Sequence, residues 1–157
     1  MASASASGLK KSGKLDLALI YSEAPAAACG VFTTNKLAAA PVKVCKENLK
    51  ARVAQAIVVN SGNANCNTGK KGMDVARKIA RYVSELTKLK DTAVLVASTG
   101  IIGRQLDFTK VKHSLPGLAS ALSRDSGNLA ARAIMTTDTK PKELMARFNM
   151  GGKIITI

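Results

Sequence analysis

The chain has 157 residues, of which 46% are hydrophobic, enough for one domain with a real core. Only 3% of the residues are aromatic and there is no Trp, so Ala, Val, Ile and Leu must build that core. No apolar run approaches the roughly 20 residues that a membrane-spanning helix needs. We therefore expect no membrane contact and a cytoplasmic protein, or one of an organelle matrix if the source is eukaryotic.

The formal net charge is +14, from 24 Lys and Arg against 10 Asp and Glu. Such an excess is compatible with a nucleic-acid partner, a solvated basic surface, or a subunit that meets an acidic partner. The basic residues are scattered, and no RNA-recognition motif with stacking aromatics accompanies them. A basic nucleic-acid-binding module is therefore kept only as an alternative.

The cysteine and histidine content argues against metal binding. Cys29, Cys45 and Cys66 are widely spaced, with no Cys-x-x-Cys, which favours reduced thiols in a cytosolic compartment. His113 is the one histidine and has no ligand pattern around it. We expect no metal.

Taken in chain order, the sequence begins with alternating Ala and Ser at residues 1–7, which predicts a disordered or vector-derived leader. Turn residues at 22–25 separate the first strand from a second apolar run at 26–32. Apolar runs and turn chemistry predict strands at 15–20, 54–59 and 92–97 and a hairpin at 147–157 that turns at Gly151 and Gly152. Helical spacing predicts helices at 43–50, 72–88, 108–122 (broken at Pro116 and Gly117) and 129–135. Alternating helices and strands indicate the α/β class, with residues 8–157 as a single domain.

Several familiar motifs fail. Residues 61–71 superficially resemble a phosphate loop, but Ala64 stands where that pattern needs Gly, and Lys71 where it needs Ser or Thr. Ser98 occupies the first glycine position of a dinucleotide fingerprint. A Ser-His-Asp triad could rest only on His113, and no nucleophile elbow is present. Nucleotide binding and triad chemistry are therefore rejected.

Two segments are chemically suggestive. Ser98, Thr99 and Gly100 end an apolar strand, where a backbone N–H beside a Thr hydroxyl could supply two donors to an oxyanion. The alternative is an ordinary strand-to-loop turn. Residues 136–139 cluster hydroxyls that could bind a polar substrate, and the alternative there is a helix cap or turn. On residue chemistry alone the plain structural interpretation is favoured for both.

Six blocks of sequence, in order, carry a family resemblance: residues 14–20, 30–35, 39–42, 59–65, 97–103 and 133–139. Through them the chain resembles the ornithine acetyltransferase (glutamate N-acetyltransferase) family of arginine biosynthesis, from residue 8 to its end. The resemblance implies a layered α/β sandwich with sheets between helical layers. It also implies a precursor that cuts itself into α and β fragments.

The implied reaction moves acetyl from N-acetylornithine to glutamate through a covalent threonine intermediate. The threonine nucleophile heads the β-chain. No cofactor is implied, although some members also use acetyl-CoA as donor. The rival enzyme class is a related self-cleaving amidase or aminopeptidase.

Carried over residue by residue, the resemblance makes Thr99 and Gly100 the oxyanion hole. Thr136 matches a substrate-binding threonine, with Thr137 as the nearest ambiguity, and the loop at residues 60–65 receives no catalytic role. The family's substrate-binding lysine and nucleophile have no counterpart here, since Thr156 sits in a strand pattern without the flanking sequence. We therefore expect a β-chain partner, an α2β2 or higher assembly, and no activity from this chain alone.

Overall fold

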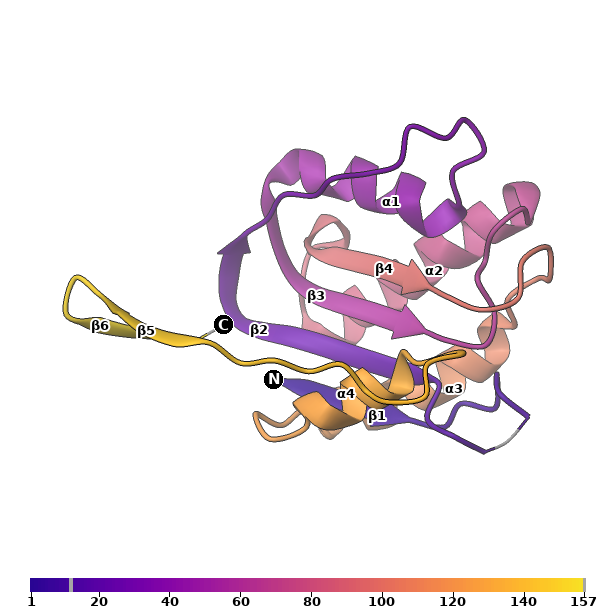
Figure 1. Ribbon diagram of the computed structural model, residues 1–157. Coiled ribbons are helices and arrows are strands. Elements are labelled where there is room, and N and C mark those ends of the chain that lie inside the picture. The colour runs from indigo at the N-terminus through magenta and orange to yellow at the C-terminus, as the bar shows by residue number, and fades with distance from the viewer. Residues whose placement is uncertain (12, 157) are drawn as a thin grey trace.

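A computed structural model describes residues 1–11 and 13–156, and Figure 1 shows its arrangement. One mixed sheet has the order β1-β2-β3-β4, in which β1 pairs with β2 and β2 with β3 antiparallel, while β3 and β4 are parallel. Its strands are β1 (Ala2–Ser5), β2 (Leu17–Ala27), β3 (Val53–Asn60) and β4 (Val94–Ser98). Helix α2 (Gly69–Thr87) connects the two parallel strands, as a crossover between parallel strands requires. The α/β class is confirmed.

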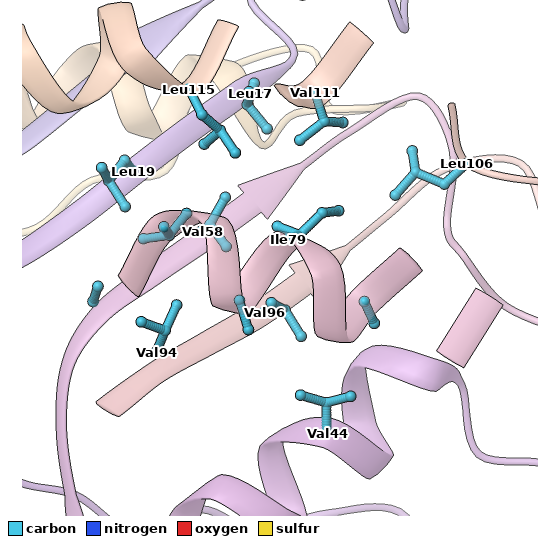
Figure 2. Close-up of a cluster of buried hydrophobic side chains, with 14 of the residues drawn as sticks. Leu17, Leu19, Val44, Val58, Ile79, Val94, Val96, Leu106, Val111 and Leu115 are labelled. Atoms are coloured by element: carbon cyan, nitrogen blue, oxygen red, sulfur yellow. The ribbon is translucent and has the colours of Figure 1, made fainter. Parts of the chain in front are cut away.

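One face of the sheet carries the main core, which Figure 2 shows in close-up. Leu17 and Leu19 of β2 and Val58 of β3 point to this face, where they are almost fully buried. Three helices cover it: α1 (Ala40–Asn48), α2 and α3 (Phe108–Ser120). Their contribution is aliphatic, as the composition requires: Val44, Ile79, Val83, Val111, Leu115 and Leu118.

The opposite face is covered in part by α4 (Gly127–Ala133). Ala18 lies between Leu17 and Leu19, so its side chain points to this second face. There it is fully buried in a small cluster that includes Ala130 and Ala133 of α4. Alanine on both sides lets the helix approach the sheet closely. The sheet thus lies between helical layers, as the family resemblance implied.

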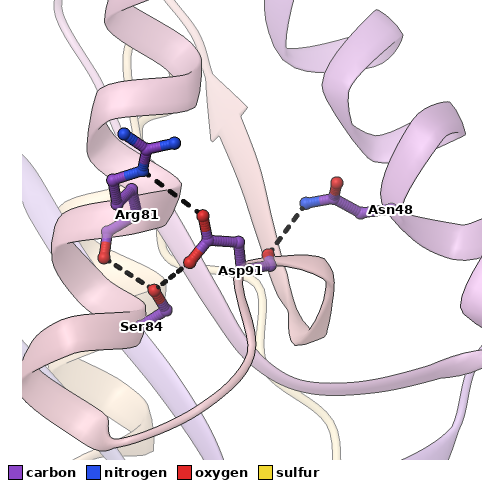
Figure 3. A network of polar contacts seen from close by, with 4 residues as sticks. All are labelled: Asn48, Arg81, Ser84 and Asp91. Carbon is purple, nitrogen blue, oxygen red and sulfur yellow. Dashed lines mark hydrogen bonds and ion pairs between the residues drawn. The ribbon is translucent and has the colours of Figure 1, made fainter.

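A polar network links the C-terminal parts of α1 and α2 to the start of β4 (Figure 3). The short 3-10 helix η2 (Asp91–Ala93) precedes β4 and carries Asp91. The Asp91 carboxylate accepts from the Ser84 hydroxyl of α2 at 2.6 Å and pairs with Arg81. Asn48 ends α1 and is followed by the 3-10 helix η1 (Leu49–Ala51). Its side chain donates to the Val94 carbonyl at 2.7 Å. Both helices are therefore anchored where β4 begins.

The predicted disordered leader differs from the structure. Residues 2–5 form β1, an ordered edge strand whose Ala2 is buried against Ala18. The Ser3 hydroxyl donates to the Leu118 carbonyl at 2.8 Å and is buried. The prediction of disorder is therefore wrong for this strand. The alternating Ala and Ser residues suggested low complexity. In the structure, their small side chains fit at the sheet edge between α3 and α4.

Two local predictions are also wrong. The expected turn at 22–25 is a bulge within β2, since the register shifts between Tyr21 and Ala26 while both still pair with β3. The second apolar run continues the strand only to Ala27. Helix α3 runs through Pro116 without the expected break. Pro116 is on the exposed side, while Leu115 and Leu118 are buried, so tertiary packing overrides the local cost of proline.

The predicted C-terminal hairpin is confirmed over its described residues. Strands β5 (Arg147–Met150) and β6 (Lys153–Thr156) pair antiparallel around Gly151 and Gly152, and Ile157 lies outside the described residues. The hairpin stands clear of the sheet (Figure 1). Its apolar side chains, including Phe148, Met150 and Ile154, are exposed.

Candidate functional site

The candidate site lies where the parallel strands β3 and β4 end, because the carboxyl ends of parallel strands meet at one edge of a sheet. Thr99 and Gly100 follow β4, and Gly62 follows β3 after one residue. The Thr99 backbone N–H donates to the Asn60 carbonyl at 2.9 Å and so continues the ladder. Within the described chain, neither the Thr99 hydroxyl nor the Gly100 N–H has a protein hydrogen-bond partner. These two donors are available to a ligand.

Gly100 is required by the geometry of the turn. Its φ is +126°, a region that favours glycine. A Cβ at this position would lie 2.5 Å from the Gly62 carbonyl carbon and 2.7 Å from the Asn63 nitrogen, both backbone atoms. The turn after β4 therefore packs directly on the turn after β3, which holds the Gly100 N–H in place.

The loop that follows β3 is a buried polar network. Asn60 accepts from the Ser98 hydroxyl at 2.6 Å and donates to the Asn63 carbonyl at 2.7 Å. Asn63 in turn donates to the Gln105 carbonyl at 3.0 Å, and Asn65 to the Gly72 carbonyl at the same distance. These amides take the place of ladder and helix hydrogen bonds where the chain is irregular. The loop therefore stiffens the turns around Gly62 and Gly100, and its amides are used within the protein.

All four predicted site residues line one cavity of about 970 Å³. Thr99 and Gly100 approach it from the end of β4, while Thr136 and Thr137 approach it from the segment after α4. Thr136, Thr137 and Gly100 are exposed, so the cavity is open to solvent on this side. Residues far apart in sequence are thus brought together as the resemblance implied. Their roles remain predictions.

The cavity is strongly basic, which sequence reasoning missed. Five cationic side chains line it against one carboxylate, Asp138: Lys10, Lys11, Lys14, Arg104 and Arg132. Asp138 is paired with Lys142, and that hydrogen bond lowers the pKa of the Asp138 carboxyl. The five cations come from three segments of the chain. No spacing in the sequence distinguished them from the other 19 basic residues (24 − 5), so only the fold could assemble them.

The remaining chemistry-bearing residues do not gather at this cavity. His113 is exposed on α3, and all three cysteines are free. Over residues 1–11 and 13–156, no three His, Cys, Asp or Glu side chains come close enough to hold a metal ion. In the same residues, no helix is both long and apolar enough to cross a bilayer.

Comparison with known proteins decides the family. The ArgJ family model matches residues 1–157. The chain belongs to the ArgJ family. It is 49% identical over 150 residues to the arginine biosynthesis bifunctional protein ArgJ of Caldanaerobacter subterraneus subsp. tengcongensis, covering 96% of this chain and 37% of the relative. It is 45% identical over 149 residues to the glutamate N-acetyltransferase of Methanocaldococcus jannaschii, covering 94% of this chain and 37% of the relative.

Two crystal structures of this family share the fold. The ArgJ bifunctional protein of Bacillus halodurans aligns with a TM-score of 0.87 at 32% identity, over 99% of this chain and 82% of that one. Ornithine acetyltransferase of Mycobacterium tuberculosis, solved in complex with ornithine, aligns with a TM-score of 0.84 at 35% identity, over 93% and 78%. The present ArgJ-family chain spans a little over a third of the length of the curated relatives it matches.

Proposed function

We propose that this chain is the α-chain part of an acyltransferase that moves acetyl from N-acetylornithine to glutamate. The observation that carries the proposal is the pair of unsatisfied donors, the Thr99 hydroxyl and the Gly100 N–H, at a cavity shared with Thr136 and Thr137. Hydrogen-bond donors from adjacent residues are what a developing oxyanion requires. The names of the relatives, ArgJ and glutamate N-acetyltransferase, supply the reaction class.

In the proposed reaction, a threonine that heads a separate β-chain attacks the acetyl carbonyl of N-acetylornithine. Its own α-amine takes the hydroxyl proton. The carbonyl oxygen becomes an oxyanion, which Thr99 and Gly100 stabilise, and the carbon–nitrogen bond then breaks. Ornithine leaves with the proton, and the acetyl group remains on the threonine. The amine of glutamate attacks the ester, which gives N-acetylglutamate and restores the threonine. The proposed reaction steps need no metal or cofactor, and acetyl-CoA is an alternative acetyl donor.

The charge of the cavity supports this choice of substrates. Both N-acetylornithine and glutamate carry carboxylates, and the cavity presents an excess of cations. Arg104 and Arg132 are exposed on its wall, where their guanidinium groups are suited to carboxylates. Thr136 and Thr137 offer hydroxyls to the same ligand. One cationic pocket that binds the carboxylates of both substrates in turn is what a ping-pong transfer needs.

Uncovered apolar surface supports a partner chain from the same precursor. Ile20 of β2 and Ile57 of β3 are directly opposed in register on the face that α4 covers only in part. They are 40% and 37% exposed. The protruding hairpin adds exposed Phe148 and Met150, and an isolated two-stranded hairpin is marginal in water. We propose that the β-chain covers these surfaces, in an α2β2 or larger assembly.

The test is product analysis with the complete protein and acetyl-labelled N-acetylornithine plus glutamate. The proposal predicts labelled N-acetylglutamate and stoichiometric ornithine. A related amidase would release labelled acetate and ignore glutamate, which would overturn the transferase assignment. Steeply salt-dependent retention on nucleic acid, without acetyl transfer, would instead favour the basic binding module.

A further inference from the structure

The ammonium group of Lys10 is held by backbone carbonyls. Its Nζ donates to the Met135 carbonyl at 2.7 Å, to the Leu15 carbonyl at 2.9 Å and to the Ala133 carbonyl at 3.4 Å. An ammonium has three N–H donors and no acceptor. All three are therefore used within the protein, although Lys10 lines the cavity.

The three acceptors belong to two segments far apart in sequence. Leu15 lies just before β2, whereas Ala133 ends α4 and Met135 directly precedes Thr136. The last carbonyls of a helix have no partners inside that helix. Lys10 supplies partners for this end of α4, and it thereby ties the Thr136 segment to the start of the sheet.

The same network reaches the turn at Thr99 and Gly100 that follows β4. The Ala133 carbonyl also accepts from the Ser61 hydroxyl, and Ser61 precedes Gly62, against which Gly100 packs. On the other side, the buried Asp16 carboxylate accepts from the backbone N–H of Lys10 at 2.9 Å. The Lys10 side chain and backbone are thus both fixed.

Lys10 differs in this respect from its basic neighbours. Lys11 and Lys14 are exposed, whereas Lys10 is partly buried. Burial lowers the pKa of the Lys10 ammonium, and the negative charge of Asp16 opposes this shift. An ammonium whose three donors are all used by backbone carbonyls is poorly suited to bind a substrate carboxylate, but well suited to hold protein segments together.

We infer that Lys10 is a positioning residue. Its ammonium holds Thr136 and Thr137 in place relative to Thr99 and Gly100 across the cavity. Small displacements of substrate-positioning groups cost turnover more than they cost affinity, since alignment matters most in the transition state. The consequence for turnover rests on the proposed acetyl transfer. The tie itself does not, and it has a readout that is independent of the reaction.

The test compares Lys10→Met with Lys110→Met in the complete protein. Lys110 is a matched control, because its exposed Nζ donates to a single carbonyl of the same N-terminal segment, Gly8 at 3.0 Å, and does not reach α4. Hydrogen exchange of the peptide covering residues 130–138 should be faster in Lys10→Met and unchanged in Lys110→Met. Per folded molecule, kcat for acetyl transfer should fall about 10- to 100-fold in Lys10→Met, with KM within about twofold.

If Lys10→Met does not fold, Lys10→Gln replaces it, since its amide keeps two N–H donors without the charge. That variant should lose about 3- to 10-fold in kcat at nearly constant KM. A raised KM with normal kcat would show that Lys10 binds substrate and would overturn the inference. Unchanged exchange at residues 130–138 would also overturn it, whatever the reaction. A wild-type protein without acetyl transfer contradicts the proposed function alone.

Discussion

At the scale of single residues, the backbone N–H and the hydroxyl of Thr99 have different hydrogen-bonding environments. Its backbone N–H belongs to the sheet, because it donates to the Asn60 carbonyl. Its hydroxyl has no protein partner in the described chain, and the residue lines the cavity. A side chain that stabilised the fold would use its hydroxyl inside the protein, as Thr68 does toward Asn65 at 2.8 Å. The free hydroxyl is therefore the group on which the assignment depends.

We predict that Thr99→Val in the complete protein lowers kcat by about 100- to 1000-fold, or ~3–4 kcal/mol. Valine keeps the shape and removes one donor that acts only where charge develops, so KM should change far less. Thr139→Val is the matched control, since Thr139 is exposed outside the cavity lining. Turnover is measured per folded, cleaved molecule beside a melting curve. A kcat within about threefold of wild type, less than ~1 kcal/mol in barrier, would make Thr99 only a turn residue.

Part of the candidate site could be predicted from the sequence. Thr99, Gly100, Thr136 and Thr137 were found through a resemblance of ordered blocks, and the fold brings them to one cavity. The cationic wall could not be found, because a lysine at a site and a lysine on a solvated surface look alike in one sequence. The role of Lys10 could not be found either. Two of its acceptors are the backbone carbonyls of Ala133 and Met135, which lie 123 and 125 residues away in the sequence.

At the scale of elements, strands and helices with clear periodicity were predictable, whereas irregular ones were not. Helix α2 and strands β3 and β4 follow their apolar patterns to within a few residues. Strand β1 was missed, because it is built of Ala and Ser and its burial comes from its neighbours. The β2 bulge and the unbroken α3 were missed because tertiary pairing and packing outweighed local turn and proline signals.

The loop after β3 offers a test of its structural role. Asn65 and Asn67 both adopt positive φ, but Asn65 is buried with three hydrogen-bond partners, while Asn67 is exposed. Asn65→Ala leaves buried donors and acceptors without partners, which typically costs ~1–3 kcal/mol for each unpaired group. We therefore expect Asn65→Ala to lower the free energy of unfolding by at least ~2 kcal/mol more than Asn67→Ala. Equal losses in denaturant unfolding would show that the network contributes nothing beyond the φ preference.

The contact between the two turns gives a second test at this scale. Gly100→Ala would drive a Cβ against the Gly62 backbone, whereas Gly103→Ala, also at positive φ, meets open space. Both substitutions carry the strain of a positive φ, about 1–2 kcal/mol. Only Gly100→Ala adds overpacking, about 1–3 kcal/mol more, and it should also displace the N–H donor. We expect a clear further loss of stability and a loss of kcat for Gly100→Ala alone. Indistinguishable variants would show that the turns are not tightly coupled.

At the scale of the whole molecule, three features of the chain bear on the proposed partner. It carries a net charge of +14, an uncovered apolar strip at Ile20 and Ile57, and an exposed hairpin. Its open cavity holds donors and cations, and the proposed reaction also needs a nucleophile. Like charge disfavours association of this chain with itself alone. These features together favour a less basic partner that completes both the surface and the site.

The most direct test of the proposed covalent mechanism is to locate the acetyl group on the enzyme. The complete protein is mixed with acetyl-labelled N-acetylornithine in the absence of glutamate, quenched, and mapped by peptide mass spectrometry. We predict one acetyl group per active site, on the N-terminal threonine of an accompanying chain, and its loss when glutamate is added. Label on Thr99, Thr156 or any other residue of this 157-residue chain, or transfer without a labelled enzyme, would contradict it.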